Sequence, residues 1–106
     1  MVYNIDDRFP STGNWKYKGE TIREVLQKDS GYIKDLIRLD DTFVLSYECM
    51  NIAMIITKGH RDNREKKYNP QFIFDGLTVY GIGTPYGFDF NNEEIQQLNK
   101  SKMTKL

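Results

Sequence analysis

The chain has 106 residues, of which 39% are hydrophobic and 13% aromatic, a balance typical of one folded domain with a single core. Its 15 Lys and Arg residues equal its 15 Asp and Glu residues, so net charge gives no sign of a dedicated polyanion binder. Cys49 is the only cysteine, which excludes an internal disulfide. No apolar run approaches the roughly 18 residues of a membrane span, and the N-terminus lacks a signal-peptide pattern, so we expect a cytoplasmic protein without a membrane partner.

The first predicted elements are a short edge strand and a hairpin. Val2, Tyr3 and Ile5 suit the strand. A two-residue turn is predicted at Lys18-Gly19, because glycine at the second turn position adopts φ > 0 without a steric clash. In that register Trp15 faces Ile22 across the hairpin, and Tyr17 faces Glu20.

Two helices are expected after this hairpin. Thr21 and Glu24 have the spacing of a capping box, so the first helix should begin at about Ile22. A break follows, and either Asp29 or Ser30 can cap the second helix. The apolar faces are formed by Ile22, Val25 and Leu26 in the first helix, and by Tyr32, Ile33, Leu36 and Ile37 in the second.

The run from Lys16 to Ile22, followed by Gly31-Tyr32-Ile33-Lys34, carries a family resemblance. Residues from about 14 to 48 resemble the small module at the C-terminal end of exodeoxyribonuclease X-like proteins, whose pattern is roughly Phe-Gly-Lys-Tyr-Lys-Gly-Lys-Thr, a helix, and Gly-Tyr-Leu-x-Trp-Leu. The chain departs from this pattern at Asn14, Trp15, Glu20 and Asp35, the last replacing a usual Trp. In that family the nuclease chemistry lies in a separate domain. The resemblance therefore implies an accessory module, with no catalytic role.

The most apolar stretch runs from Phe43 to Ile56. Two neighbouring stripes at helical spacing predict a helix buried on a wide face, although the β-branched run at 55–57 leaves strand as the alternative. Lys58 and Gly59 suit the end of such a helix.

The second half of the chain predicts a charged connector at 60–70 and then an antiparallel hairpin or meander. Asp75-Gly76 is the predicted hairpin turn between two β-capable runs. Alternating aromatic residues at 86, 88 and 90 suggest a third strand, and Asn91 or Asn92 can cap a short last helix. Residues 99–106 are polar and are expected to fray.

The connector provides the strongest candidate site. Its basic residues, with one aromatic neighbour, suit phosphate contacts and base stacking on single-stranded nucleic acid. The alternative is a solvated loop, because charges of both signs are mixed there. The candidate nucleic-acid-binding residues are Lys16, Lys18, Arg61, Arg64, Lys66, Lys67 and Tyr68.

No enzyme site is predicted. His60 is the only histidine and has no neighbouring metal ligand or nucleophile in the sequence. The carboxylates at 6–7, 40–41, 89 and 93–94 could in principle hold Mg²⁺, but the structural interpretation is favoured, because 40–41 suit a helix cap and 93–94 suit a helix N-terminus. The glycines at 81–87 lack the Gly-Lys-Ser/Thr ending of a phosphate-binding loop. We expect no catalytic residue, no metal and no cofactor.

The predicted fold is α+β, a small single domain over residues 1–106. A hairpin-helix-helix module with a buried helix spans 14–59, the charged connector spans 60–70, and the meander with a short C-terminal helix spans 71–98. The resemblance implies a non-catalytic accessory module that associates with DNA or RNA. The alternative is a domain that binds another protein through the aromatic surface between Phe72 and Phe90.

Overall fold

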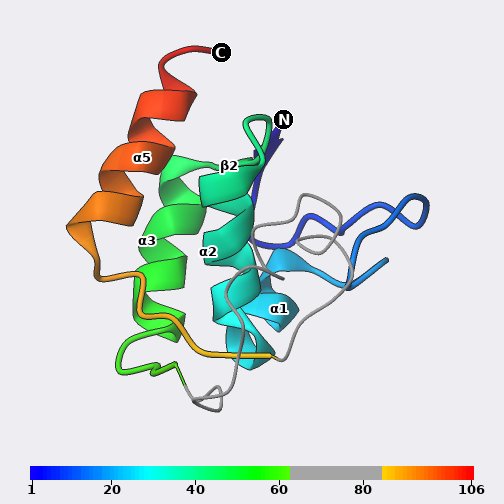
Figure 1. The fold of residues 1–106 in the computed structure, drawn as a ribbon, viewed down its shortest axis with the longest axis horizontal. Helices are drawn as coiled ribbons and strands as arrows, with labels where there is room; N and C mark the ends of the chain where they lie inside the picture. Colours follow the sequence, from blue (N-terminus) through cyan, green and yellow to red (C-terminus); the bar gives the residue numbers. More distant parts are fainter. Residues whose placement is uncertain (63–84) are drawn as a thin grey trace.

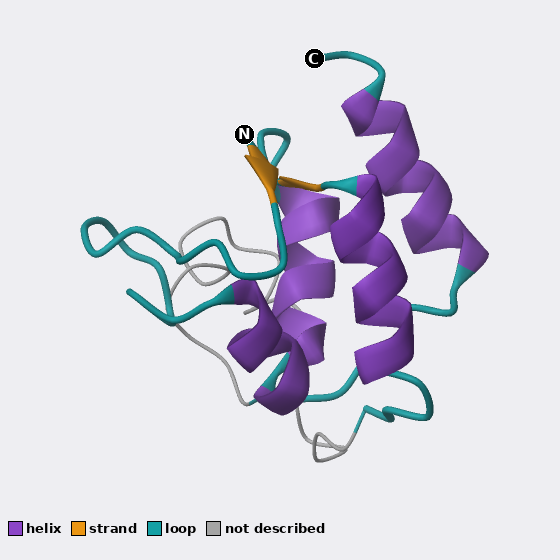
Figure 2. Cartoon of the chain, turned by 180° about the vertical axis from the view of Figure 1, so that it is seen from behind, coloured by secondary structure: helices purple, strands orange, loops and turns teal. Residues whose placement is uncertain are grey.

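The computed structural model describes residues 1–62 and 85–106. The elements of these residues are, in chain order, β1 (Val2–Tyr3), α1 (Ile22–Lys28), α2 (Ser30–Leu39), β2 (Val44–Leu45), α3 (Tyr47–Ile56) and α5 (Glu93–Met103). Figure 1 shows α2 between α1 and α3, with α5 on the far side of α3. The view from behind places the two strands at the same end of the helices as both chain termini (Figure 2). The α+β class is confirmed.

The predicted N-terminal strand forms, but its partner is parallel. Val2 pairs with Val44 and Tyr3 with Leu45. The other edge of β2 is completed by a side chain: the Asn99 amide accepts from Leu45 N and donates to Leu45 O, both at 2.9 Å. Asn99 therefore satisfies backbone groups that a third strand would otherwise bond. The predicted hairpin at 71–80 lies outside the described residues.

The turn at Lys18-Gly19 forms as predicted, but the predicted pairing between the segments before and after the turn is wrong. Gly19 has φ +76°, and Glu20 N donates to Tyr17 O at 3.2 Å. The chain after the turn then bonds to Phe9, which accepts from Gly19 N at 3.0 Å and donates to Glu20 O at 2.9 Å. A type I′ hairpin would need positive φ at both turn residues, and Lys18 does not have it. Pairing with Phe9 also buries the Phe9 ring in the core.

The helix starts follow the predicted caps. Thr21 and Glu24 form both halves of a capping box on α1, and Asp29 caps α2. Asn92 caps α5. The predicted helix from Phe43 to Ile56 needs a correction at its start. Val44–Leu45 is a strand, and Ser46 caps a helix that begins only at Tyr47. Ser is a strong N-cap residue, and its place inside the apolar run marks the boundary.

Residues 85–90 do not form the predicted third strand. They cross beneath the helices in extended form, towards α5 (Figure 1). Their amides are satisfied by side chains: Phe88 N donates to Ser30 Oγ at 2.7 Å, and Phe90 N to Thr57 Oγ1 at 2.8 Å. Tyr86 and Phe90 are buried. The alternation of aromatic residues therefore reflects packing onto helices.

The C-terminal residues are more firmly held than expected. The helix α5 continues to Met103, and Asn99 is buried. Lys102 Nζ donates to Ile37 O at 2.7 Å and to Asp40 O at 2.9 Å, so it bonds carbonyls at the C-terminal end of α2. Burial lowers the pKa of Lys102. The prediction that residues 99–106 fray is wrong for 99–103.

Gly31 provides a test of the packing between α2 and residues 85–90. A Cβ at this position would lie 2.3 Å from ring atoms of Tyr86. We expect Gly31→Ala to lower the free energy of unfolding by about 1–3 kcal/mol, the usual cost of overpacking. In a Tyr86→Ala background the clash is gone, and the same change should stabilise by about 0.4–1 kcal/mol because it reduces unfolded-state entropy. Urea unfolding of the parent, the two single variants and the double variant measures both effects. If Gly31→Ala changed the free energy of unfolding with the same sign in both backgrounds, the packing of Gly31 on Tyr86 would be contradicted.

Candidate functional site

A buried carboxylate, Asp29, organises the segment that carries the family resemblance. Its side chain is 1% exposed. One oxygen accepts from Tyr17 Oη at 2.7 Å and Lys16 Nζ at 2.9 Å. The other accepts from Tyr86 N at 3.0 Å and Tyr32 N at 3.3 Å. A buried charge needs compensation of this kind, and Asp29 receives it from three separate parts of the chain.

Lys16 is held by the same network. Its ammonium lies 5.3 Å from the Tyr17 ring centroid and 5.8 Å from that of Tyr32, and its side chain is only 15% exposed. Its backbone N donates to Tyr32 Oη at 3.2 Å. The Lys16 charge is therefore paired with Asp29 inside the fold, which does not suit the phosphate contact predicted for it. Lys18, by contrast, is exposed.

The other predicted binding residues fall only partly within the described ranges. Arg61 is exposed, at the end of the first range. Arg64, Lys66, Lys67 and Tyr68 lie outside the described residues. The structure thus neither brings the basic set together nor separates it.

The alternative binding surface, the aromatic stretch from Phe72 to Phe90, needs a correction at its described end. Tyr86 and Phe90 are buried, and Phe88 is half-buried. These rings contribute to the fold and offer little surface to a partner.

His60, at the start of the predicted charged connector, is half-buried. Its Nδ1 lies 3.0 Å from Ser30 Oγ, a serine–histidine contact that the sequence did not predict. Ser30 is 1% exposed, and its hydroxyl also accepts from Phe88 N. A nucleophile must reach its substrate, so this burial favours a structural role for the pair. Among the groups described here, no cluster of three His, Cys, Asp or Glu side chains is arranged to hold a metal.

Asp35 occupies the position where the family pattern usually has Trp. It is buried and forms an ion pair with Lys34, whose Nζ lies 2.8 Å from Asp35 Oδ1. The Lys34 ammonium is also 5.0 Å from the Tyr86 ring centroid and 5.5 Å from that of Phe88. Trp15 packs on Phe9, with ring centroids 5.4 Å apart. Charge pairing, together with the nearby aromatic rings, thus accommodates the Asp at this family position.

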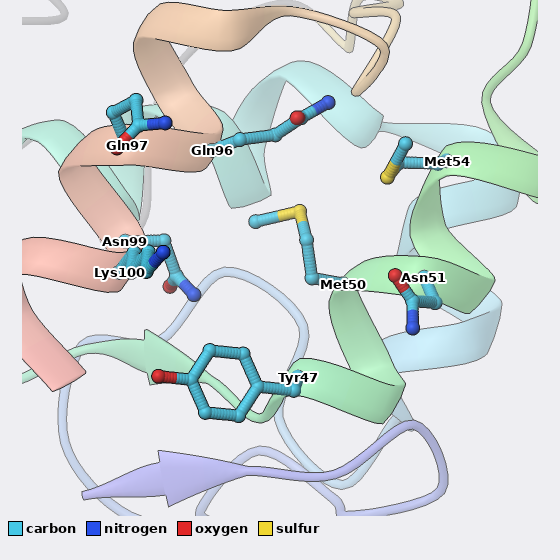
Figure 3. Close-up of a pocket in the computed structure, with 8 residues that line it drawn as sticks. All are labelled: Tyr47, Met50, Asn51, Met54, Gln96, Gln97, Asn99 and Lys100. Atoms are coloured by element: carbon cyan, nitrogen blue, oxygen red, sulfur yellow. The ribbon is translucent and has the colours of Figure 1, made fainter.

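A groove of about 330 Å³ lies between α3 and α5 (Figure 3). Tyr47, Met50 and Met54 line it from α3, and Gln96, Gln97 and Lys100 line it from α5. Met50 lies near its centre, Tyr47 and Lys100 at one end, and Met54 and Gln96 at the other (Figure 3). Sequence reasoning missed this groove. The available signals were Tyr47 and Asn51, one helical turn apart within a mostly apolar run.

Comparison with known families finds a similarity over the part of the chain that holds most of the Asp29 network. Residues 16–40 match the family described as exodeoxyribonuclease X-like C-terminal. The predicted resemblance is therefore confirmed over this part of the chain, which we call the exodeoxyribonuclease X-like segment. Searches of curated proteins and of solved structures give no match. In the ranges 1–62 and 85–106, no helix has the length and apolar character to cross a membrane.

The network predicts that the fold is sensitive to the loss of the Asp29 carboxylate. Replacing it with Ala leaves the Lys16 ammonium without its carboxylate, and we expect a loss of about 3–5 kcal/mol in the free energy of unfolding. The matched control is Asp6→Ala, which removes an exposed ion pair with Arg23 and should change the free energy of unfolding far less. Denaturant unfolding of both variants measures the difference. Similar losses would show that Asp29 does not support the fold as described.

Tyr17 should make stability depend on alkaline pH. Burial and the hydrogen bond to Asp29 raise its pKa above the ordinary value of 10.0. The folded state therefore keeps the phenol proton where the unfolded chain has lost it, so this contribution is complete below about pH 10 and declines above it. We expect the free energy of unfolding to fall more steeply above pH 10 in the parent than in Tyr17→Phe. Urea unfolding between pH 8 and about 11 compares the two; parallel curves would contradict the assignment.

Proposed function

We propose that the protein is a non-catalytic accessory module that associates with nucleic acid. The observation that carries this proposal is the match of residues 16–40 to the exodeoxyribonuclease X-like C-terminal family. The residues that resemble the family pattern, including Lys16, Tyr17 and Tyr32, meet around Asp29 and build the fold. This segment thus acts as a scaffold, and the contacts with nucleic acid come from charges outside the network.

The contacts we assign are phosphate contacts. Lys18 and Arg61 are exposed, and Arg64, Lys66 and Lys67 follow Arg61 closely in the sequence. Basic side chains release counterions from nucleic acid, which gives binding that weakens with salt. Because the formal net charge of the whole chain is zero, we expect modest affinity at physiological salt.

The absence of catalysis is part of the proposal. It is supported by the burial of the Ser30 hydroxyl and by the state of the single cysteine. Burial raises the pKa of the Cys49 thiol to about 12, so the thiolate that a nucleophile requires is disfavoured. A buried free thiol is also compatible with the reducing environment of the cytoplasm, which we propose as the location.

The test is a salt titration of binding to labelled single- and double-stranded DNA and RNA. The parent protein should bind with an affinity that falls steeply with salt. Replacing Arg61, Arg64, Lys66 and Lys67 with Ser should weaken binding to all sequences alike. It should also flatten the log–log slope by about 0.7 to 0.9 for each phosphate that the variant no longer neutralises.

A matched pair of variants separates the predicted site from overall charge. The first double variant combines Lys66→Ser and Lys67→Ser in the connector. The second combines Arg38→Ser and Lys105→Ser, which removes the same charge from two exposed residues that lie outside the connector in the sequence. Only the first pair should flatten the slope. If both double variants flattened the slope equally, binding would depend on overall charge and not on the connector. If the parent did not bind at low salt, the proposed function would be rejected.

A further inference from the structure

The groove between α3 and α5 has the character of a ligand site. Its volume of about 330 Å³ is at the lower end of the range for small-molecule sites. Met50 is almost fully buried and closes the floor, so the open part of the groove is bounded by polar side chains, the Tyr47 ring and, at one end, the half-buried Met54. These walls are held in place, because the Asn99 amide bonds both backbone groups of Leu45 and so fixes α5 against the strand that precedes α3.

The side chains at the groove suit a flat polar ligand. Tyr47 is 58% exposed, so one aromatic face is available for stacking. Asn51 and Gln97 have carboxamides with no hydrogen-bond partner within the described ranges, and each offers a donor beside an acceptor. Such a carboxamide is complementary to the donor–acceptor edge of a nucleobase, adenine in particular.

The charge at the groove selects for an anion. Lys100 is the only charged residue among the described groove-lining residues, and none of those residues is a carboxylate. Lys100 lies at the same end as Tyr47 (Figure 3). A base stacked on the Tyr47 ring would therefore place its phosphate on the side of a cation.

We propose that this groove binds one unpaired base of a single-stranded nucleic acid, stacked on Tyr47, with its edge bonded by the Asn51 carboxamide and its phosphate near Lys100. This inference deepens the proposed function and rests on it. It also adds a preference that phosphate contacts alone do not give. A base in a duplex is stacked on its neighbours, so single strands should bind more tightly than duplexes, and adenine more tightly than thymine.

The experiment uses the full chain and labelled oligonucleotides of about twelve adenines or twelve thymines, each alone and annealed to the other. Tyr47→Ala should weaken binding to the adenine strand roughly 5- to 150-fold, the effect of removing the stacking platform of one base. Tyr47→Phe keeps the ring and should bind like the parent. Ile55→Ala removes another exposed apolar side chain of α3, outside the groove lining, and should also have no effect.

Two further variants test the polar part of the site. Asn51→Ala should reduce the preference for adenine over thymine, and Lys100→Gln should lower the salt slope by about 0.7. Tyr47, Asn51 and Lys100 are exposed, so all of these variants should fold like the parent, which circular dichroism and urea unfolding check.

The outcomes separate this inference from the proposed function. If the parent binds nucleic acid but Tyr47→Ala binds equally well, the groove is not the base site, while the accessory role stands. Tighter binding of the duplex than of the adenine strand would likewise overturn the groove assignment alone. If the parent binds no oligonucleotide at low salt, both the proposed function and the groove assignment are rejected.

Discussion

The structure depends on one buried negative charge. Asp29 ends α1, caps α2, and accepts hydrogen bonds from Lys16, Tyr17 and the backbone of Tyr86. Burying a carboxylate costs free energy unless each of its oxygens accepts hydrogen bonds. All of these donors must therefore be in place in the folded state. The segment before α1, the junction of the two helices and the segment that leads to α5 are therefore fixed by the same group. The exodeoxyribonuclease X-like segment supplies most of this network, which explains why its pattern of Lys, Tyr and Gly matters for folding.

Much of the helical part of the fold could be predicted from sequence because helix starts are local. The Thr21–Glu24 capping box, the Asp29 cap and the Asn92 cap each depend on residues within one turn; the box was predicted outright, and each of the other caps was one of two predicted alternatives. The turn at Gly19 is local too. The segment that pairs with the chain after this turn is not local, because burial of Phe9 decides the pairing. A short window of sequence around Gly19 does not contain Phe9 and its core contacts.

The errors share a physical cause. Residues 85–90 have the alternation of a strand, but Ser30 and Thr57 supply hydrogen bonds that a neighbouring strand would have provided. Asn99 does the same for β2. Side chains that replace a strand are distant in sequence from the backbone that they bond, so periodicity alone cannot distinguish the two cases.

The candidate site was less predictable than the fold. The sequence identified Lys16 as a basic surface residue, but only the structure shows that the Asp29 carboxylate takes up its charge. The groove at Tyr47 needs α3 and α5 side by side, although more than thirty residues separate them along the chain. Phosphate contacts from a charged run can be inferred from composition, whereas a base-sized groove arises only from packing.

The close approach of Gly87 to Arg61 has a consequence for the stretch of chain between them. A Cβ at Gly87 would lie 2.5 Å from the Arg61 carbonyl oxygen, so the two described ranges meet beside the point where each ends. A connection that leaves and returns at one place needs no particular span. The packing of residues 1–62 and 85–106 thus holds Arg61 and Gly87 together, so the distance that the intervening stretch must close is already short.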